Sequence, residues 1–146
     1  MTWHAAKEFC QSLGNSRLVE IDSKTENDAI SAEMQRLQRL TGRMRPDRNS
    51  ANNTETRNSV NNTVETRRDK SQCTDFWMGL SDRRVEGRFV LESNGRSPSF
   101  TAWGGDEPNN AGGEDCALRG RAWNDFKCDR SSNDWCQISA ICEKYT

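Results

Sequence analysis

The sequence predicts a single α+β domain over residues 1–146, stapled by disulfides. Two amphipathic helical patterns open the chain, and several short strand patterns occupy its second half. Only 32% of the residues are hydrophobic, and the mean hydropathy is −1.01. A core this small needs further support, and six cysteines give an even number for pairing. Paired cysteines indicate an oxidising compartment, so we expect a secreted, extracellular protein.

Residues 3–14 carry the first helical pattern. Apolar side chains recur every three to four residues, which predicts one buried helix face. That face consists of Trp3, Ala6, Phe9, Cys10 and Leu13. Gly14 follows, and glycine readily adopts the positive φ that ends a helix. His4 is the only histidine, and we expect it to be a solvated helix residue.

A short strand over residues 17–21 and a second helix come next. Ser23 and Glu26 form a capping-box pattern, in which each side chain bonds a free backbone N–H at the start of a helix. The helix is expected to run to about Leu40. Its apolar face carries Ala29, Ile30, Met34 and Leu37.

Residues 41–72 break this pattern with a polar stretch rich in Asn, Thr, Ser and Arg. Too little apolar surface is present to offset the ordering entropy, so we expect a mobile insertion. Asn52 and Asn61 begin N-glycosylation sequons. The basic excess of the segment leaves two interpretations, an inert insertion or a surface for acidic glycans.

The second half of the chain reads as short strands around long loops. Residues 76–80 form a buried strand, and residues 88–91 follow after a charged loop. The remaining expected strands cover residues 116–118, 122–124 and 139–145. Trp77, Trp103 and Trp123 lie in apolar or strand contexts, so we expect them in the core.

A dense set of oxygen donors lies between residues 107 and 125. Its members are Glu107, Asn109, Asn110, Glu114, Asp115, Asn124 and Asp125. Carboxylate and amide oxygens at irregular, loop-like spacing suit Ca²⁺, which takes six to eight oxygens in flexible geometry. Pro108 and the Gly112–Gly113 pair indicate a loop. The alternative interpretation is a solvated polar loop without an ion.

The motifs in this region resemble a known family. Glu107-Pro108-Asn109, then Glu-Asp-Cys at 114–116, then Trp-Asn-Asp at 123–125 and a later cysteine are similar to the mannose-type C-type lectin-like domain. The resemblance implies a principal calcium ion held by Glu107, Asn109, Glu114, Asn124 and Asp125. The same five residues would bind the sugar, and the Glu107–Pro108 peptide would be cis.

The resemblance also implies a second calcium ion and a disulfide pattern. The auxiliary ion would be held by Asp82, Glu86, Asn110, Glu114 and Asp115. An ordinary charged turn is the alternative for Asp82 and Glu86. The family pattern pairs Cys10 with Cys142 and Cys116 with Cys128, which leaves Cys73 for Cys136.

The Glu-Pro-Asn order implies a sugar class. In the family it selects equatorial 3- and 4-hydroxyls, as in mannose, N-acetylglucosamine and glucose, with fucose accommodated. A single sugar on an open site binds weakly, so homo-oligomerisation would add avidity. Arg119 and Arg121 are candidates for a second sugar or an acidic group at the border of the site, against the alternative of solvated turn arginines.

Other function classes have less support. A structural module that binds a protein or a mineral surface is the main rival to a lectin of innate immune recognition. No Ser/His/Asp or Cys/His set suggests an enzyme, so no catalytic residue is assigned. The net charge of −1 gives no reason to expect nucleic acid. No apolar run of about 18 residues predicts a membrane span.

Overall fold

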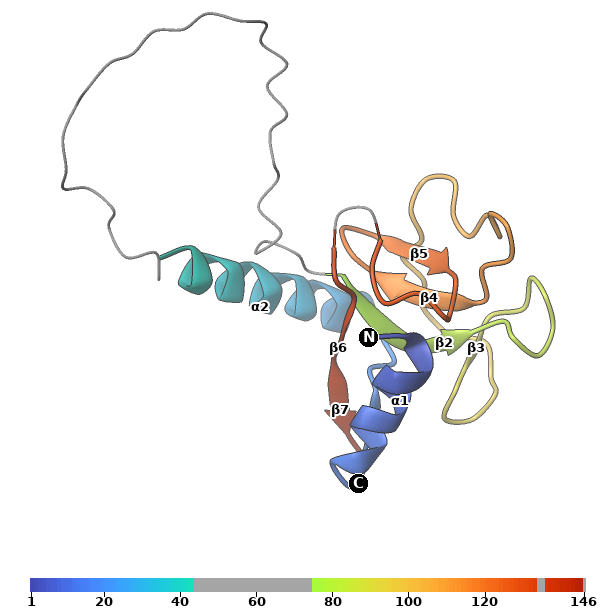
Figure 1. Ribbon diagram of the computed structural model, residues 1–146, viewed down its shortest axis with the longest axis horizontal. Helices are drawn as coiled ribbons and strands as arrows, with labels where there is room; N and C mark the ends of the chain where they lie inside the picture. The colour runs from blue at the N-terminus through green and yellow to red at the C-terminus, as the bar shows by residue number, and fades with distance from the viewer. Residues whose placement is uncertain (44–74, 134–135, 146) are drawn as a thin grey trace, which may run out of the picture.

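The computed structural model describes residues 1–43, 75–133 and 136–145. Two helices and seven short strands occupy these ranges, so the predicted α+β class is confirmed. They are α1 (Trp3–Ser12), β1 (Ser16–Leu18), α2 (Lys24–Arg43), β2 (Phe76–Ser81), β3 (Val90–Leu91), β4 (Cys116–Arg119), β5 (Trp123–Phe126), β6 (Ser139–Ala140) and β7 (Cys142–Lys144). Figure 1 shows α2 leaving the sheets on one side, whereas the loops around β3 and before β4 gather on the other.

The strands form two small sheets. Strands β1 and β7 pair antiparallel, and the larger sheet has the order β3-β2-β4-β5. Strand β6 also pairs with β2, but in parallel. The predicted closing strand is therefore divided, because its first part joins the larger sheet and its second part joins β1.

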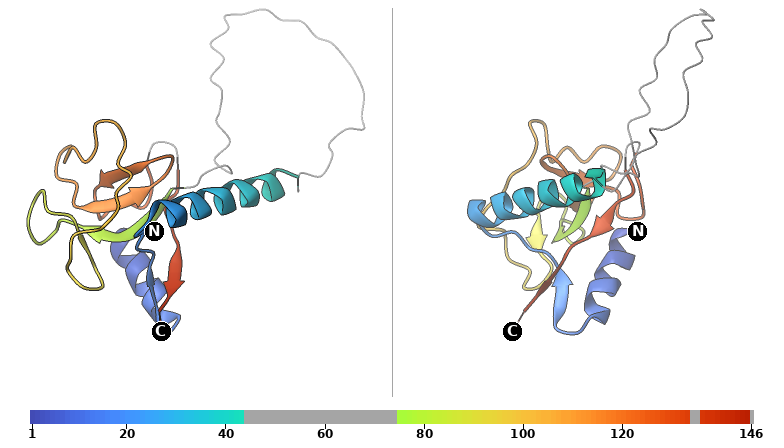
Figure 2. Two further views of the ribbon diagram at one scale, coloured as in Figure 1. Left: turned by 180° about the vertical axis from the view of Figure 1, so that it is seen from behind. Right: turned by 90° about the vertical axis from the view of Figure 1, so that its left-hand side faces the viewer.

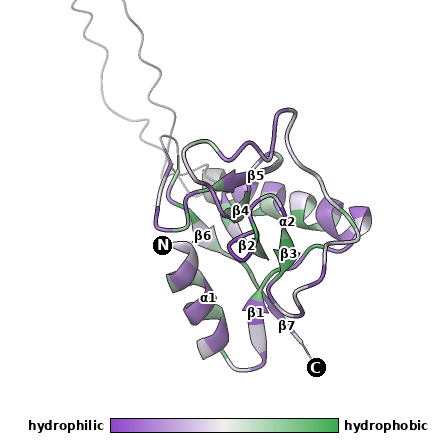
Figure 3. Ribbon diagram, turned by 90° about the vertical axis from the view of Figure 1, so that its right-hand side faces the viewer, coloured by the Kyte–Doolittle hydropathy of each residue, from purple (hydrophilic) through white to green (hydrophobic). Residues whose placement is uncertain are grey.

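Strand β2 is the centre of the core. All six of its residues are buried, and alternate side chains enter different clusters, as the period of two in a strand requires. Trp77 packs with α1, whereas Phe76 and Met78 pack with Trp123. Figure 3 shows hydrophobic colour along the central strands and hydrophilic colour along much of α1.

Helix α1 covers one side of this core with part of the predicted face. Thr2 caps its start by accepting a hydrogen bond from the Ala5 backbone N–H at 3.2 Å. Gly14 ends it with a φ of 69°. Trp3, Ala6 and Cys10 are buried as predicted. The prediction is wrong for Phe9 and Leu13, which lie at the edge of the apolar stripe and are 47% and 53% exposed.

Helix α2 begins with the predicted capping interactions. The Ser23 hydroxyl accepts from the Glu26 N–H at 3.1 Å, and the Glu26 carboxylate accepts from the Asp22 N–H at 3.0 Å. Glu26 thus reaches one residue farther back than the capping box predicts. Ile30 and Met34 pack against the core, but Ala29 is exposed and Leu37 is 42% exposed.

The helix runs through residues 41–43, so the boundary predicted at residue 41 is wrong by one turn. The rest of the predicted insertion, including Asn52 and Asn61, lies outside the described residues. Neither helix within the described ranges is long and apolar enough to cross a membrane.

Two of the three predicted disulfides are confirmed. Cys10–Cys142 joins α1 to β7, and Cys116–Cys128 joins β4 to the segment after β5. The predicted Cys73–Cys136 pair involves Cys73, which is outside the described residues. The two views in Figure 2 show that α1 and β7 lie side by side.

Candidate metal and ligand-binding site

Backbone bonds to β5 hold the stem of the donor-rich loop. The Trp123 N–H donates to the Ala102 carbonyl at 3.0 Å, and the Gly104 N–H donates to the Trp123 carbonyl at 2.9 Å. Residue 103 thereby bridges to residue 123. Because Asn124 and Asp125 follow directly in β5, this stem places the loop beside them.

The loop then turns sharply twice. The Glu107–Pro108 peptide is cis, as the resemblance predicts, and Asn110 has a φ of 50°. Gly112 and Gly113 have φ values of 74° and 85°, which glycine adopts without the steric cost that a side chain would add. These turns bring residues 107–114 back toward β5.

The Asp125 side chain holds the loop in place by hydrogen bonds to its backbone. The side chain is buried, and its two oxygens accept from the Asn109 N–H at 3.1 Å and the Asn110 N–H at 2.6 Å. Hydrogen bonds to a carboxylate from backbone N–H groups are charge-assisted and strong. Asp125 therefore fixes the position of the Glu-Pro-Asn segment before any ligand arrives.

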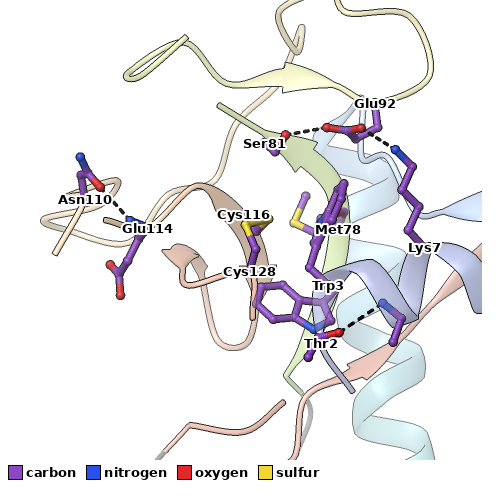
Figure 4. The surroundings of a disulfide bond; sticks show 12 residues. Thr2, Trp3, Lys7, Met78, Ser81, Glu92, Asn110, Glu114, Cys116 and Cys128 are labelled. Atoms are coloured by element: carbon purple, nitrogen blue, oxygen red, sulfur yellow. Dashed lines mark hydrogen bonds and ion pairs between the residues drawn. A yellow bond between two sulfur atoms is a disulfide. The ribbon is translucent and has the colours of Figure 1, made fainter. Parts of the chain in front are cut away.

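The other predicted donors bond within the same loop. The Asn109 side-chain amide donates to Glu107 Oε1 at 2.9 Å. Glu114 Oε2 accepts from the Ala111 N–H at 3.2 Å, and the Glu114 N–H donates to Asn110 Oδ1 at 2.7 Å. Figure 4 shows the last of these bonds, with the Glu114 carboxylate turned away from the disulfide.

Two oxygens of this set are buried without a hydrogen-bond partner. They are Glu107 Oε2 and Asn124 Oδ1. Buried polar atoms are rarely left unpaired, because each costs about 1–3 kcal/mol. Both atoms are oxygen acceptors of the kind that a hard cation binds. The residues present therefore fit a calcium ion at the predicted principal site.

The carboxyls of the site are incompletely neutralised. Burial, followed by the close approach and the charge of the Asp125 carboxylate, raises the pKa of Glu107 to about 7. Burial and the Asp125 charge likewise raise the pKa of Glu114. A bound cation would lower both pKa values by favouring the ionised forms.

A second group of acids lies in the loop after β2. Asp82 is buried, Oδ2 accepts from the Gly87 N–H at 2.8 Å, and Oδ1 has no partner. The Asp82 N–H donates to the Asp115 carbonyl at 3.1 Å. Burial raises the pKa of Asp82, and the charge of Asp115 raises it further. Desolvation likewise raises the pKa of Glu86, and the charges of Asp82 and Asp115 add to this effect.

The auxiliary set is thus only partly assembled. Asp82, Glu86 and Asp115 are close enough for their charges to interact, but Asn110 Oδ1 is occupied by the Glu114 N–H. Within residues 1–43, 75–133 and 136–145, no group of three His, Cys, Asp or Glu side chains stands ready to hold a metal. The unpaired oxygens of Glu107, Asn124 and Asp82 nevertheless provide acceptors for a cation, and carboxylates that repel one another move apart when no cation lies between them.

The alternative of a solvated turn residue is wrong for Arg119. Its side chain is 5% exposed, and it turns toward α2, where Nε donates to Asn27 Oδ1 at 3.1 Å. It is therefore neither a solvated turn residue nor part of the donor set. Arg121 is exposed, as a turn arginine should be. Trp77 and Trp123 are buried as predicted, and Trp103 is half-buried.

Lys127 is a charged neighbour of the donor set that the sequence analysis did not identify. The charge of Lys127 acts to lower the pKa of Glu114, and a Cβ on Gly112 would lie 3.3 Å from Lys127 Nζ. The only signal in the sequence that could have identified Lys127 is its position two residues after Asp125. Lys127 supplies a positive charge next to the loop, which partly offsets the acidic cluster.

Comparisons with known proteins show the family to which the chain is similar. The model of the "Lectin C-type domain" family matches residues 47–144. "C-type lectin domain family 4 member M" of Pan troglodytes is 45% identical over 69 residues, which are 45% of this chain and 16% of that protein. The "Low affinity immunoglobulin epsilon Fc receptor" of Mus musculus is 44% identical over 73 residues, 47% of this chain and 22% of the receptor. The matches thus span less than a quarter of these relatives.

A solved structure extends the similarity along the chain. The carbohydrate-recognition domain of the mouse scavenger receptor C-type lectin aligns with a TM-score of 0.52 and 25% identity, covering 88% of this chain and 73% of that domain. The similarity therefore extends over most of the chain.

Proposed function

Since the chain belongs to the C-type lectin domain family, we propose that it binds carbohydrate with the help of calcium held by the principal donor set. That set is Glu107, Asn109, Glu114, Asn124 and Asp125. The unpaired buried oxygens of Glu107 and Asn124 carry the proposal. The relatives named as lectins, and a fold neighbour titled a carbohydrate-recognition domain, support it.

The donor set has the chemistry to orient a sugar. Carboxylates of Glu107 and Glu114 can only accept hydrogen bonds, whereas the amides of Asn109 and Asn124 can donate. A hydroxyl placed between one carboxylate and one amide is therefore fixed as donor to the first and acceptor from the second. Bound calcium would supply direct ligation of two neighbouring hydroxyl oxygens.

The proposed sugar class is the mannose type. The order Glu107-Pro108-Asn109 supports a preference for equatorial 3- and 4-hydroxyls, and Asn109 already donates to Glu107 across the proline. A single sugar at such an exposed loop buries little surface, so the affinity is expected to be about millimolar. Clustering in a homo-oligomer would raise the avidity, which suits a secreted protein of innate immune recognition.

Column binding tests the proposal. The protein should be retained on immobilised mannan in calcium and released by EDTA or free mannose, but not by galactose. Glu107→Gln should abolish retention, because it removes a charged ligand of the proposed ion. Asp106→Asn, a change at the exposed acid next to it, is the matched control and should be retained. Failure of the folded wild-type protein to bind would overturn the sugar assignment.

A second calcium ion is proposed at Asp82, Glu86, Asn110, Glu114 and Asp115. The buried, unpaired Asp82 Oδ1 supports it. Ion binding there would require Asn110 Oδ1 to leave the Glu114 N–H. Calorimetric titration should give two ions for the wild-type chain and one for Asp82→Asn. One ion in both proteins would restrict calcium to the principal set.

Protein binding is the second candidate function. It is favoured by the similarity to a protein named as an immunoglobulin receptor. The two candidates differ in the column test, because a protein-binding domain with purely structural ions would be stabilised by calcium without being retained on mannan.

A further inference from the structure

A polar pocket of about 470 Å³ lies away from the donor loop, between α2 and the turn that joins β4 to β5. Ser31 and Gln35 line it from the helix, and Arg119, Gly120 and Arg121 line it from the turn. We propose that this pocket is a second binding site, which takes an oxyanion, the sulfate or carboxylate group of an acidic saccharide. The site uses none of the calcium donors, so it goes beyond the proposed lectin function.

The first observation is a buried cation with neutral partners. Arg119 is 5% exposed, and its guanidinium donates to the Asn27 carbonyl at 3.2 Å, the Gly120 carbonyl at 3.3 Å, and the Ser31 hydroxyl. Together with the bond from Nε to Asn27 Oδ1, these use four of the five N–H groups of an arginine. The remaining N–H, on Nη1, is left for a ligand.

No carboxylate within the described ranges forms an ion pair with Arg119. Burying a charge without a counter-charge is unfavourable. Burial accordingly lowers the pKa of the Arg119 guanidinium, although the charge of Asp28 acts to raise it. Asp28 itself pairs with Lys24 at 2.5 Å. An anion in the pocket would provide the missing negative charge.

The second observation is the set of groups around Arg119. Arg121 is exposed at the same turn, and Gln35 is exposed on α2. Two guanidinium groups and an amide are donors that bind sulfate and carboxylate groups, whereas the Ser31 O–H is already donated to the Asn27 carbonyl at 2.8 Å. Asp75 lies against Gly120 but is not among the residues that line the pocket, and its Oδ2 accepts from the Asn133 amide at 2.5 Å. The volume falls within the range of about 300–1,000 Å³ that is usual for ligand sites, and the polar lining favours a charged ligand.

The third observation supplies a built-in reporter. Trp123 Nε1 donates at 3.2 Å to Asn27 Oδ1, the same oxygen that accepts from Arg119 Nε. A change in the bonding of Arg119 will therefore move the resonances of both N–H groups. Both are resolved side-chain signals that can be followed in ¹H–¹⁵N spectra.

Titration in EDTA tests the pocket while the calcium-dependent site is silent. Sodium sulfate, glucose 6-sulfate and glucuronate are each added at constant ionic strength, with sodium chloride and glucose as references. We expect saturable shifts of the Arg119 Nε–H and Trp123 Nε1–H signals with at least one anion and none with glucose. A response to glucose 6-sulfate alone identifies a sulfated saccharide, and a response to glucuronate alone identifies a carboxylated one.

Two variants and one control make the test specific. Arg121→Ala and Gln35→Glu should each weaken the anion at least tenfold, the first by removing a cation and the second by adding a negative charge. Arg39→Ala, at an exposed arginine of α2 outside the pocket lining, should bind as the wild type does. Shifts that follow chloride equally, or that persist unchanged in both variants, would overturn the proposal, as would the absence of saturable shifts with all three anions.

Discussion

Glu107 couples the proposed calcium site to pH. Its pKa of about 7 arises first from burial and then from Asp125. Below that pH the carboxyl holds a proton that calcium must displace, and above it the ionised ligand is ready. Apparent calcium affinity should therefore rise from pH 5.5 to 7 by about tenfold per unit and level off above 7.

Calcium titrations followed by tryptophan fluorescence measure this directly. Glu107→Gln should bind calcium weakly and lose the step near 7, and a wild-type affinity unchanged between pH 8 and 6 would contradict the assignment.

Gly79 shows how tightly one residue of β2 fits. A Cβ there would lie 2.9 Å from both Glu20 Cγ and the Leu18 carbonyl oxygen. Backbone cannot yield as a flexible side chain can, so Gly79→Ala should destabilise the protein by about 1–3 kcal/mol. Urea unfolding measures the loss. Gly105→Ala, where a Cβ would meet nothing within 4 Å, should stay close to wild type, and equal losses in the two variants would argue against a steric cause.

At the scale of elements, Asn27 joins α2 to the hairpin that carries Asn124 and Asp125. Its side-chain oxygen accepts from Arg119 on β4 and from Trp123 on β5. Asn27→Ala leaves both N–H groups buried and unpaired, which should cost about 1–3 kcal/mol. Because the hairpin positions two of the proposed calcium ligands, calcium affinity should fall as well. Arg39→Ala on the exposed side of α2 is the control for both measurements, and full calcium affinity in a destabilised Asn27→Ala would separate folding from site geometry.

Local sequence patterns predicted the helices and strands themselves better than the contacts between them. The apolar run at 76–80 and the capping pattern at Ser23 depend on near neighbours in the chain, and both elements are present. The parallel pairing of β6 with β2 joins segments about 60 residues apart, as in Phe76 with Ser139, and no local signal encodes it. The same limit applies to Arg119, whose burial depends on contacts with a helix about 90 residues earlier.

The donor set was predictable for a different reason. Its members lie on two short stretches around Glu107 and Asn124, and the motifs that place them resemble a family whose model matches this chain. The orientation of each side chain was not predictable, because Asn110 could serve either an ion or its own loop. In the structure, Asn110 Oδ1 accepts a hydrogen bond from the Glu114 N–H.

At the scale of the whole molecule, the two described disulfides should contribute differently. Cys10–Cys142 spans 132 residues and links α1 to β7, whereas Cys116–Cys128 spans 12 and borders the donor loop. Loop-closure entropy predicts a loss of about 5 kcal/mol for the first and about 3 kcal/mol for the second. Paired Cys→Ser variants of each bridge, compared by urea unfolding, should follow that order. Calcium affinity should follow the opposite order, because only the short bridge holds β4 against the segment that follows Asn124 and Asp125. A greater loss of calcium affinity in the Cys10/Cys142 variant would mean that the site depends on closure of the whole domain rather than on the local hairpin.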